Sequence, residues 1–289
     1  MAISNSLSTK KGSRLGLTAY LTQDAVKDQI NKVVGGKDGQ RFISAIISAT
    51  TANPTLQECT NQSILSGALL GESLKLSPSP QLGQYYLVPY NDREKGKVAQ
   101  FQLGYKGYIQ LAIRSGQYKK LNVLAIKEGE LIRFDPLNEE IEVKLIDDEE
   151  AREQASTIGY YAMFEYVNGF KKAMYWSKAK MEAHALKYSP GFASDKKKGT
   201  AYTFWSKDFD GMAYKTMLRQ LISKWGIMSI EMSTAFDADY AVINEDGTKN
   251  YVETESDVIY MPEVIEVQEE KAEDSVNVFN DAQAALFEE

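Results

Sequence analysis

The sequence has 289 residues, 43% of them hydrophobic, and its 40 Asp and Glu against 33 Lys and Arg give a formal net charge of −7. That length can bury a sizeable core in one main folded unit. The one cysteine excludes a disulfide within the chain and a cysteine-based metal knuckle, and no apolar run reaches the roughly 18 residues of a membrane span. The first residues lack the apolar stretch of a signal peptide, so we expect a soluble, unexported protein.

The charge is divided unevenly along the chain. Residues 231–289 contain 17 Asp and Glu but two Lys, a charge of −15, whereas residues 1–230 contain 31 Lys and Arg against 23 Asp and Glu, a charge of +8. A basic body with an acidic tail is typical of a domain that binds a polyanion, although such a tail also favours solubility alone.

The N-terminal part predicts a flexible arm followed by helices. Residues 1–21 are rich in Ser, Thr, Lys and Gly, so we expect a poorly ordered basic arm. Apolar spacing then predicts three helices. They cover about residues 22–35, a segment that begins near Asp38, and a segment that takes Asn53 as its N-cap and continues to about Leu70.

The pattern then changes to strands. The runs GQYYLVPY and VAQFQLGY, joined by the polar loop NDREKGK, predict a β-hairpin, and a helix over about residues 106–115 follows. Three further strands are expected in YKKLNVLAIKEG, ELIRF and EEIEVKLI. Asn168-Gly169 lies between two aromatic runs and predicts a second antiparallel hairpin with a tight two-residue turn.

The C-terminal part returns to helices and ends in the acidic tail. Ser177 is suited to cap a helix that ends near residue 187, a loop holds Lys196 to Lys198, and a long helix is expected from about residue 202 to Trp225. The fold class is therefore α+β, with antiparallel hairpins and a sheet packed against helices. We expect a main domain over residues 22–239 and a mobile acidic tail over residues 240–289.

The residues that usually carry enzyme chemistry are scarce. No G-x-x-x-x-G-K-[ST] phosphate loop is present, so ATP hydrolysis is not expected. His184 is the single histidine, and we assign it a structural or surface role rather than that of a catalytic base. Asp208 and Asp210 are two residues apart, and on a helix such residues point in different directions, so they do not form a shared metal site. Cys59 is interpreted as a packing residue. We expect no catalysis, cofactor or metal.

Basic residues interleaved with aromatic residues remain as the candidate binding surface. In FWSKDFDGMAYKTMLRQLISKWG, Lys207, Lys215 and Arg219 are spaced by eight and four residues and would share one helix face, with Trp225 on the buried side. A second group begins with Lys106 and Arg114, which are also eight residues apart. Each group alone is equally compatible with a solvated helix face and with a binding surface. The two groups together favour a groove.

These blocks carry a resemblance to a known family. GALLGESLKLSPSPQLGQYYLVPY, QFQLGYKGYIQLAIRSGQYKKLNVLAIKEGE and FWSKDFDGMAYKTMLRQLISKWG resemble the core of the RecT family of phage recombinases, over about residues 56–228. The resemblance implies a protein of the bacterial host cytoplasm with a β-β-β-α core, which anneals single-stranded DNA through a duplex intermediate without ATP. It also implies homo-oligomeric rings or helical filaments, a partner exonuclease, and recruitment of that exonuclease or of the host single-strand-binding protein by the tail.

The two basic groups supply the expected DNA contacts. We expect phosphate contacts from Lys106, Arg114, Lys207, Lys215 and Arg219, and weaker ones from Lys119, Lys120 and Lys224. Base stacking or core packing is expected of Tyr105, Tyr108, Trp205 and Phe209. Lys196 to Lys198 are candidates for steadying a second strand. Two alternatives from other classes stay open: a phage structural or scaffold protein, and a magnesium-dependent nuclease.

Overall fold

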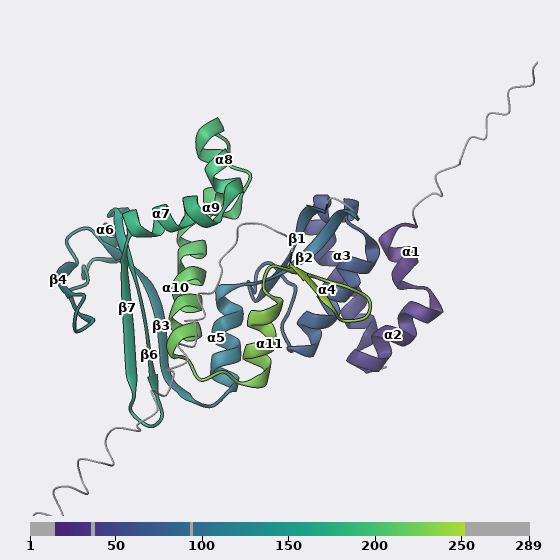
Figure 1. Cartoon of the computed structure of the whole chain (residues 1–289), viewed down its shortest axis with the longest axis horizontal. Helices are drawn as coiled ribbons and strands as arrows, with labels where there is room; N and C mark the ends of the chain where they lie inside the picture. The colour runs from purple at the N-terminus through teal and green to yellow at the C-terminus, as the bar shows by residue number, and fades with distance from the viewer. Residues whose placement is uncertain (1–14, 36–37, 93–94, 252–289) are drawn as a thin grey trace, which may run out of the picture. The chain divides into compact units, whose positions relative to one another are not determined.

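Antiparallel sheets packed against helices make up the part of the chain that the computed structural model describes, residues 15–35, 38–92 and 95–251 (Figure 1). All of these residues belong to one unit. The arrangement confirms the predicted α+β class. Most of the expected basic arm and the acidic residues from 252 onward lie outside the described residues.

Helices form the N-terminal part of the unit. They are α1 (Leu17–Leu21), α2 (Asp24–Val34), α3 (Gly39–Ala52), the 3-10 helix η1 (Pro54–Glu58) and α4 (Asn61–Ser73). The predictions of α2 and α3 are confirmed. The helix α1 was not predicted: Leu21, in the segment expected to be a flexible arm, is completely buried.

The third predicted helix is divided into two. The side chain of Asn53 makes no capping hydrogen bond, η1 ends at Cys59 in extended conformation, and the side chain of Thr60 accepts a hydrogen bond from Ser63 N to start α4. The cap that begins the long helix therefore lies seven residues after the one that the sequence suggested. Cys59 is buried in the first core, as a packing residue should be.

The first sheet has the order β1-β2-β8-β9 and is antiparallel throughout. Its strands are β1 (Tyr85–Asp92), β2 (Gly96–Leu103), β8 (Ala241–Ile243) and β9 (Lys249–Tyr251). The β1–β2 hairpin was predicted. The expected boundary at residue 240 lies inside this sheet, because residues 241–243 are buried against β2. Helix α4 packs against the sheet so closely that a Cβ on Gly71 would lie 2.3 Å from the ring of Tyr85.

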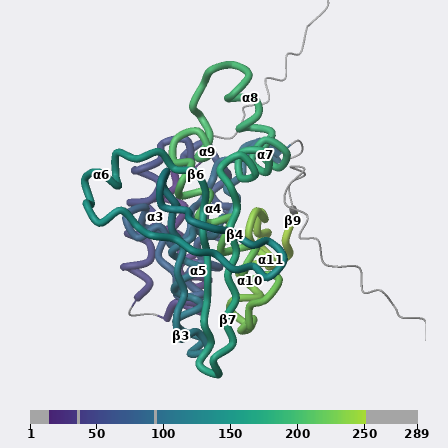
Figure 2. Tube along the Cα trace, turned by 90° about the vertical axis from the view of Figure 1, so that its left-hand side faces the viewer, coloured from purple at the N-terminus to yellow at the C-terminus, as the bar shows by residue number. Residues whose placement is uncertain are grey.

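The second sheet has the order β3-β6-β7 and is also antiparallel. Its strands are β3 (Tyr118–Lys127), β6 (Thr157–Tyr166) and β7 (Lys171–Ser177). Alternate residues of the central strand, Tyr160, Ala162 and Phe164, are buried in a second core under the helix α10 (Phe209–Trp225). In Figure 2 this sheet lies in front of α10. Three antiparallel strands and a later helix are the β-β-β-α arrangement that the resemblance implied.

The turn between β6 and β7 differs from the prediction. Strand pairing ends at Glu165 and Lys171, Tyr166 N donates to Phe170 O at 2.9 Å, and in this turn Gly169 alone has a positive φ, of 89°. The connection is therefore longer than the two-residue turn that Asn168-Gly169 suggested.

The remaining elements are helices and the two strands of a third, antiparallel sheet. They are α5 (Tyr105–Arg114), β4 (Leu131–Asp135), β5 (Glu140–Val143), α6 (Glu149–Gln154), α7 (Lys178–Tyr188), α8 (Pro190–Lys198), α9 (Phe204–Lys207) and α11 (Ile230–Ala238). Helix α5 packs against α10 between the two sheets (Figure 1).

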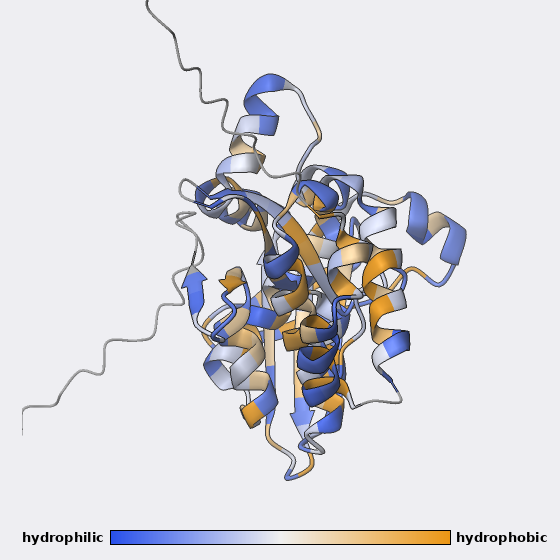
Figure 3. Ribbon diagram, turned by 90° about the vertical axis from the view of Figure 1, so that its right-hand side faces the viewer, coloured by the Kyte–Doolittle hydropathy of each residue, from blue (hydrophilic) through white to orange (hydrophobic). Residues whose placement is uncertain are grey.

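Two predictions in the C-terminal part were wrong. Lys196 to Lys198 form the last turn of α8 rather than a loop, because Ser189 caps that helix and Pro190 is its first residue. This polar helix is the blue element at the top of Figure 3. The expected helix over residues 202–225 is interrupted at Asp208, whose non-helical backbone ends α9 and whose side chain caps α10.

Candidate nucleic-acid interface

Two of the expected phosphate contacts lie in a buried ionic cluster. Lys215 Nζ lies 3.2 Å from Asp239 Oδ1, and Arg219 Nη1 lies 2.6 Å from Asp239 Oδ2. Asp239 also accepts hydrogen bonds from Leu103 N and Tyr108 Oη, each at 2.9 Å. Burial, reinforced by the nearby Asp239 carboxylate, raises the pKa of Tyr108. The cluster joins α5, β2 and α10 to Asp239, the residue that follows α11 and lies two residues before β8.

The burial of these side chains corrects the expected basic face. Lys215 is 5% exposed and Arg219 is 6% exposed, so neither presents its charge to solvent as a phosphate contact would require. Lys207 is on α9, on the other side of the break at Asp208, and does not continue their helix face. The regular spacing is real, but the face that it defines is turned inward.

Lys106 and Lys207 are exposed and make no ion pair within the described ranges. Both lie at what we call the α5–α9 junction, formed by Tyr86, Lys106, Phe204 and Lys207. The rings of Tyr86 and Phe204 are 5.7 Å apart, and Tyr86 Oη and Lys106 Cδ lie 3.1 and 3.4 Å from the point where a Cβ on Gly83 would stand. Lys207 follows Phe204 by three residues, which places the two on one face of α9. The junction therefore combines two unpaired cations with two aromatic rings.

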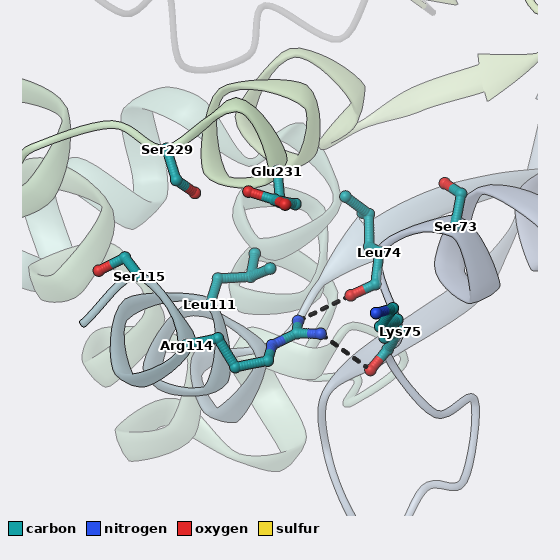
Figure 4. Close-up of a pocket in the computed structure, with 8 residues that line it drawn as sticks. All are labelled: Ser73, Leu74, Lys75, Leu111, Arg114, Ser115, Ser229 and Glu231. Atoms are coloured by element: carbon teal, nitrogen blue, oxygen red, sulfur yellow. Dashed lines mark hydrogen bonds between the residues drawn. The ribbon is translucent and has the colours of Figure 1, made fainter.

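Arg114 is exposed but is engaged with the end of α4. Its Nη2 donates to Leu74 O at 2.7 Å, and its Nη1 donates to Lys75 O at 3.5 Å (Figure 4). It lines a cavity of about 340 Å³ with Lys75 and Glu231. The pKa of Glu231 is held low first by hydrogen bonds from its own backbone N–H and from Ser229, and then by the positive charges of Arg114 and Lys75. Arg114 thus stabilises a helix end, and part of its positive charge is balanced by Glu231.

Lys119 and Lys120 belong to a group of three lysines around one carboxylate. Glu165 is 4% exposed on β6, and Lys119, Lys171 and Lys120 approach it to 2.7, 3.5 and 3.9 Å. The hydrogen bond from Lys119, followed by the charges of the three lysines, lowers the pKa of Glu165. Since one negative charge faces three positive ones, the group keeps a net positive charge on the surface.

Most of the expected stacking residues pack in the cores. Tyr108 is fully buried 5.0 Å from the ring of Phe236, and Trp205, which is 7% exposed, contacts Phe209 at 5.1 Å. Tyr105 lies edge-on to Tyr214 at 5.8 Å. The aromatic residues exposed in the described part of the chain were not among the candidates: Phe170, Tyr202, Phe204 and Trp225 are 46%, 80%, 43% and 49% exposed. Trp225 had been placed on the buried side of its helix because it follows Leu221 by four residues.

The side chains considered for enzyme chemistry have structural contacts. Asp208 accepts from Gly211 N at 2.9 Å as a helix cap, and Asp210 accepts from Tyr160 Oη at 2.6 Å. The ring of His184 lies 5.3 Å from that of Trp176 and 4.6 Å from that of Tyr188. No group of three or more metal-ligating residues occurs in the described part of the chain. In the same part, no helix combines the length and apolarity needed to cross a membrane.

Comparison with known proteins decides the family. The model of the RecT family matches residues 40–271, which include every strand of both sheets. The chain belongs to the RecT family. It is 40% identical over 237 residues to the uncharacterized protein YqaK of Bacillus subtilis, covering 82% of this chain and 74% of that protein. It is 27% identical over 225 residues to the protein RecT of Escherichia coli, covering 76% of this chain and 79% of that protein. RecT-family membership supports a role in phage-type recombination by strand annealing.

Proposed function

We propose that this RecT-family protein binds single-stranded DNA along its backbone and pairs it with a complementary strand without ATP. The observation that carries the proposal is the family match over residues 40–271, since it covers nearly the whole described unit. Annealing needs no nucleotide fuel, because stacking stabilises the duplex by on the order of 1.4 kcal/mol for each base step that forms. The protein has to lower the kinetic barrier that phosphate repulsion sets up between two strands.

The exposed cations support a backbone-binding role. Lysines without an acidic partner can neutralise phosphates and release condensed counterions, which makes binding independent of sequence and sensitive to salt. Within the described ranges, Lys106 and Lys207 are such residues. Lys119 and Lys120 add the net charge of their group around Glu165.

We place the principal contact at the α5–α9 junction. There Lys106 and Lys207 can hold phosphates while Tyr86 and Phe204 offer rings to the bases. Helix α5 also begins at this point, and its free N–H groups favour an anion. Arg114 lies at the other end of the same helix and would extend the path of the strand. Lys215 and Arg219 then contribute indirectly, by fixing α10 against α5.

The wider biological setting follows the family. We propose a homo-oligomer, in a ring or a helical filament, that acts in the bacterial cytoplasm with a partner exonuclease and the host single-strand-binding protein. The acidic C-terminal residues would recruit these partners or shield the basic body when DNA is absent. No catalytic step and no cofactor is part of this proposal.

Mixing the purified protein with complementary oligonucleotides, with no nucleotide present, tests the proposal. The protein should bind each strand with an affinity that rises with strand length and should accelerate duplex formation equally with or without a non-hydrolysable ATP analogue. A scaffold protein would show no length-dependent binding, and a nuclease would shorten the strands on a denaturing gel when magnesium is added. Either result, or a strict nucleotide requirement, would overturn the proposal.

A further inference from the structure

A row of tryptophans and lysines follows the edge of the second sheet. We call it the β7–α10 strip and define it by Lys172, Trp176, Lys180, Lys224 and Trp225. Lys172 Nζ lies 3.9 Å from the ring centre of Trp225, and Lys180 Nζ lies 4.6 Å from the ring centre of Trp176. Lys172 and Trp176 are four residues apart on one face of β7, about 13 Å along the strand. The end of α10 therefore meets β7 in a continuous basic and aromatic surface.

The positive charges of the strip outnumber the acidic side chains that pair with them. Among the described residues, its one ion pair joins Lys172 to Glu139. The pKa of Lys180 is lowered, first by partial burial and then by the positive charge of Lys224. Two like charges thus face each other without an acidic partner in the described part of the chain, an arrangement that an anion between them would stabilise.

The chemistry of the strip fits a strand of DNA. Trp225 is 49% exposed, so its free ring surface can take a base, and indole rings stack on any base. The lysines beside the rings match a backbone that carries one phosphate about every 3.4 Å along a base-stacked strand. An acidic protein segment would satisfy the lysines but would leave the exposed ring of Trp225 without a stacking partner.

The strip is separate from the α5–α9 junction. Lys215 and Arg219 on α10 point toward α5 and Asp239, whereas Lys224 is five residues after Arg219 and so lies about 140° further around the helix. Helix α10 therefore stands between the two surfaces. A protein that pairs two strands has a use for two polyanion contacts, one for the strand already bound and one for the strand that arrives.

We propose that the β7–α10 strip captures the complementary strand before it pairs with the strand held at the α5–α9 junction. This inference rests on the proposed annealing function. The two contacts would act in sequence, so damage to the strip should leave the first binding step intact.

The test compares the two steps in one set of variants. Lys180→Gln/Lys224→Gln changes two exposed side chains and removes a repulsion, so the fold should be retained. Trp225→Phe removes the indole alone. The matched control is Lys27→Gln/Lys32→Gln on α2, which removes the same charge from an exposed helix face to which no DNA contact is assigned. First-strand affinity is measured by anisotropy with a labelled oligonucleotide. Second-strand capture is measured by stopped-flow energy transfer after a labelled complement is added to the preformed complex.

We expect the Lys180→Gln/Lys224→Gln protein to bind the first strand within twofold of the wild type and to capture the complement at least fivefold more slowly. The logarithmic salt slope of the capture step should fall by about 1.4, from about 0.7 per lost contact on a single strand. Tryptophan quenching on addition of the complement should be smaller in Trp225→Phe, and the α2 control should behave as the wild type. Unchanged capture, or equal losses in both steps, overturns the proposal. A wild-type protein that binds no first strand would instead remove the proposed function itself.

Discussion

The buried ionic cluster predicts that replacing one carboxylate by an uncharged amide strongly lowers the free energy of unfolding. Asp239→Asn keeps the size of the side chain but leaves Lys215 and Arg219 buried with no negative charge between them. Removing one partner of a buried ion pair costs about 3–5 kcal/mol, because the remaining charge stays out of water. This is a large part of the roughly 5–15 kcal/mol that keeps a typical domain folded.

Urea denaturation followed by circular dichroism measures this loss. For a unit of this size we take a slope near 3 kcal/mol per molar urea, so the midpoint should fall by about 1–2 M. The control is Asp237→Asn in α11, two residues earlier; the side chain of Asp237 is 67% exposed and lies 3.9 Å from Lys249. An exposed pair contributes about 0–1 kcal/mol, so this control should shift the midpoint little. If Asp239→Asn were as stable as the control, Lys215 and Arg219 would be free in solution, and their assignment as structural residues would be wrong.

Three further predictions concern binding, pH and the tail. Lys106→Gln/Lys207→Gln should weaken single-strand binding of all sequences alike and lower the logarithmic salt slope by about 1.4. Anisotropy measures both, with Lys32→Gln on α2 as a control that should change little. Hydrogen bonds from Thr200 and from the backbone and side chains that follow it hold the pKa of Asp195 below its usual value. The Asp195 carboxylate therefore stabilises the fold fully above about pH 4, and this contribution is lost as the pH falls. The difference in unfolding temperature between wild type and Asp195→Asn should therefore shrink on acidification, and a constant difference would contradict this. Truncation after Tyr251 removes 12 Asp and Glu and one Lys, so single-strand binding at low salt should tighten while the fold is kept; weaker binding would show that the tail supports the interface.

The elements that the sequence predicted correctly have strong local signals. The loop between β1 and β2, the glycine of the β6–β7 turn and the Ser177 cap of α7 each act on their own few residues. Such signals do not depend on the rest of the fold. The α+β class and the β6–β7 hairpin could therefore be predicted from local patterns, whereas the pairing of β3 with β6 across β4, β5 and α6 could not.

The errors arise where a distant residue decides the structure. The spacing of Lys215 and Arg219 shows that they share a helix face, but the burial of that face depends on Asp239, which is 24 and 20 residues later. Asp239 adjoins a segment that was judged to be an acidic tail because of its charge. Strand β8 has three residues, too few for a period of two to be visible. A truncation after Tyr240 would remove this strand and should unfold the sheet.

The binding surface was predicted only in part, for a related reason. Lys106 and Lys207 were selected from the sequence and are exposed. They meet at one junction because Tyr86 contacts Phe204, a contact between distant segments that no local pattern shows. The exposed Trp225 was assigned to the core because helical spacing places it beside Leu221. Trp225 is the last residue of α10 and lies against Lys172 of β7, half exposed, and spacing alone does not show where a helix leaves its core.

The central claim is that the protein anneals strands without chemical fuel. The most direct measurement is the initial rate of duplex formation from two complementary labelled oligonucleotides, in buffer without nucleotide, as protein is increased from none to saturation of the strands. The account predicts a rate that rises well above the protein-free rate, is unchanged by ATP, and disappears when the second strand is not complementary. A rate equal to that of the protein-free reaction, with both strands bound, would contradict it.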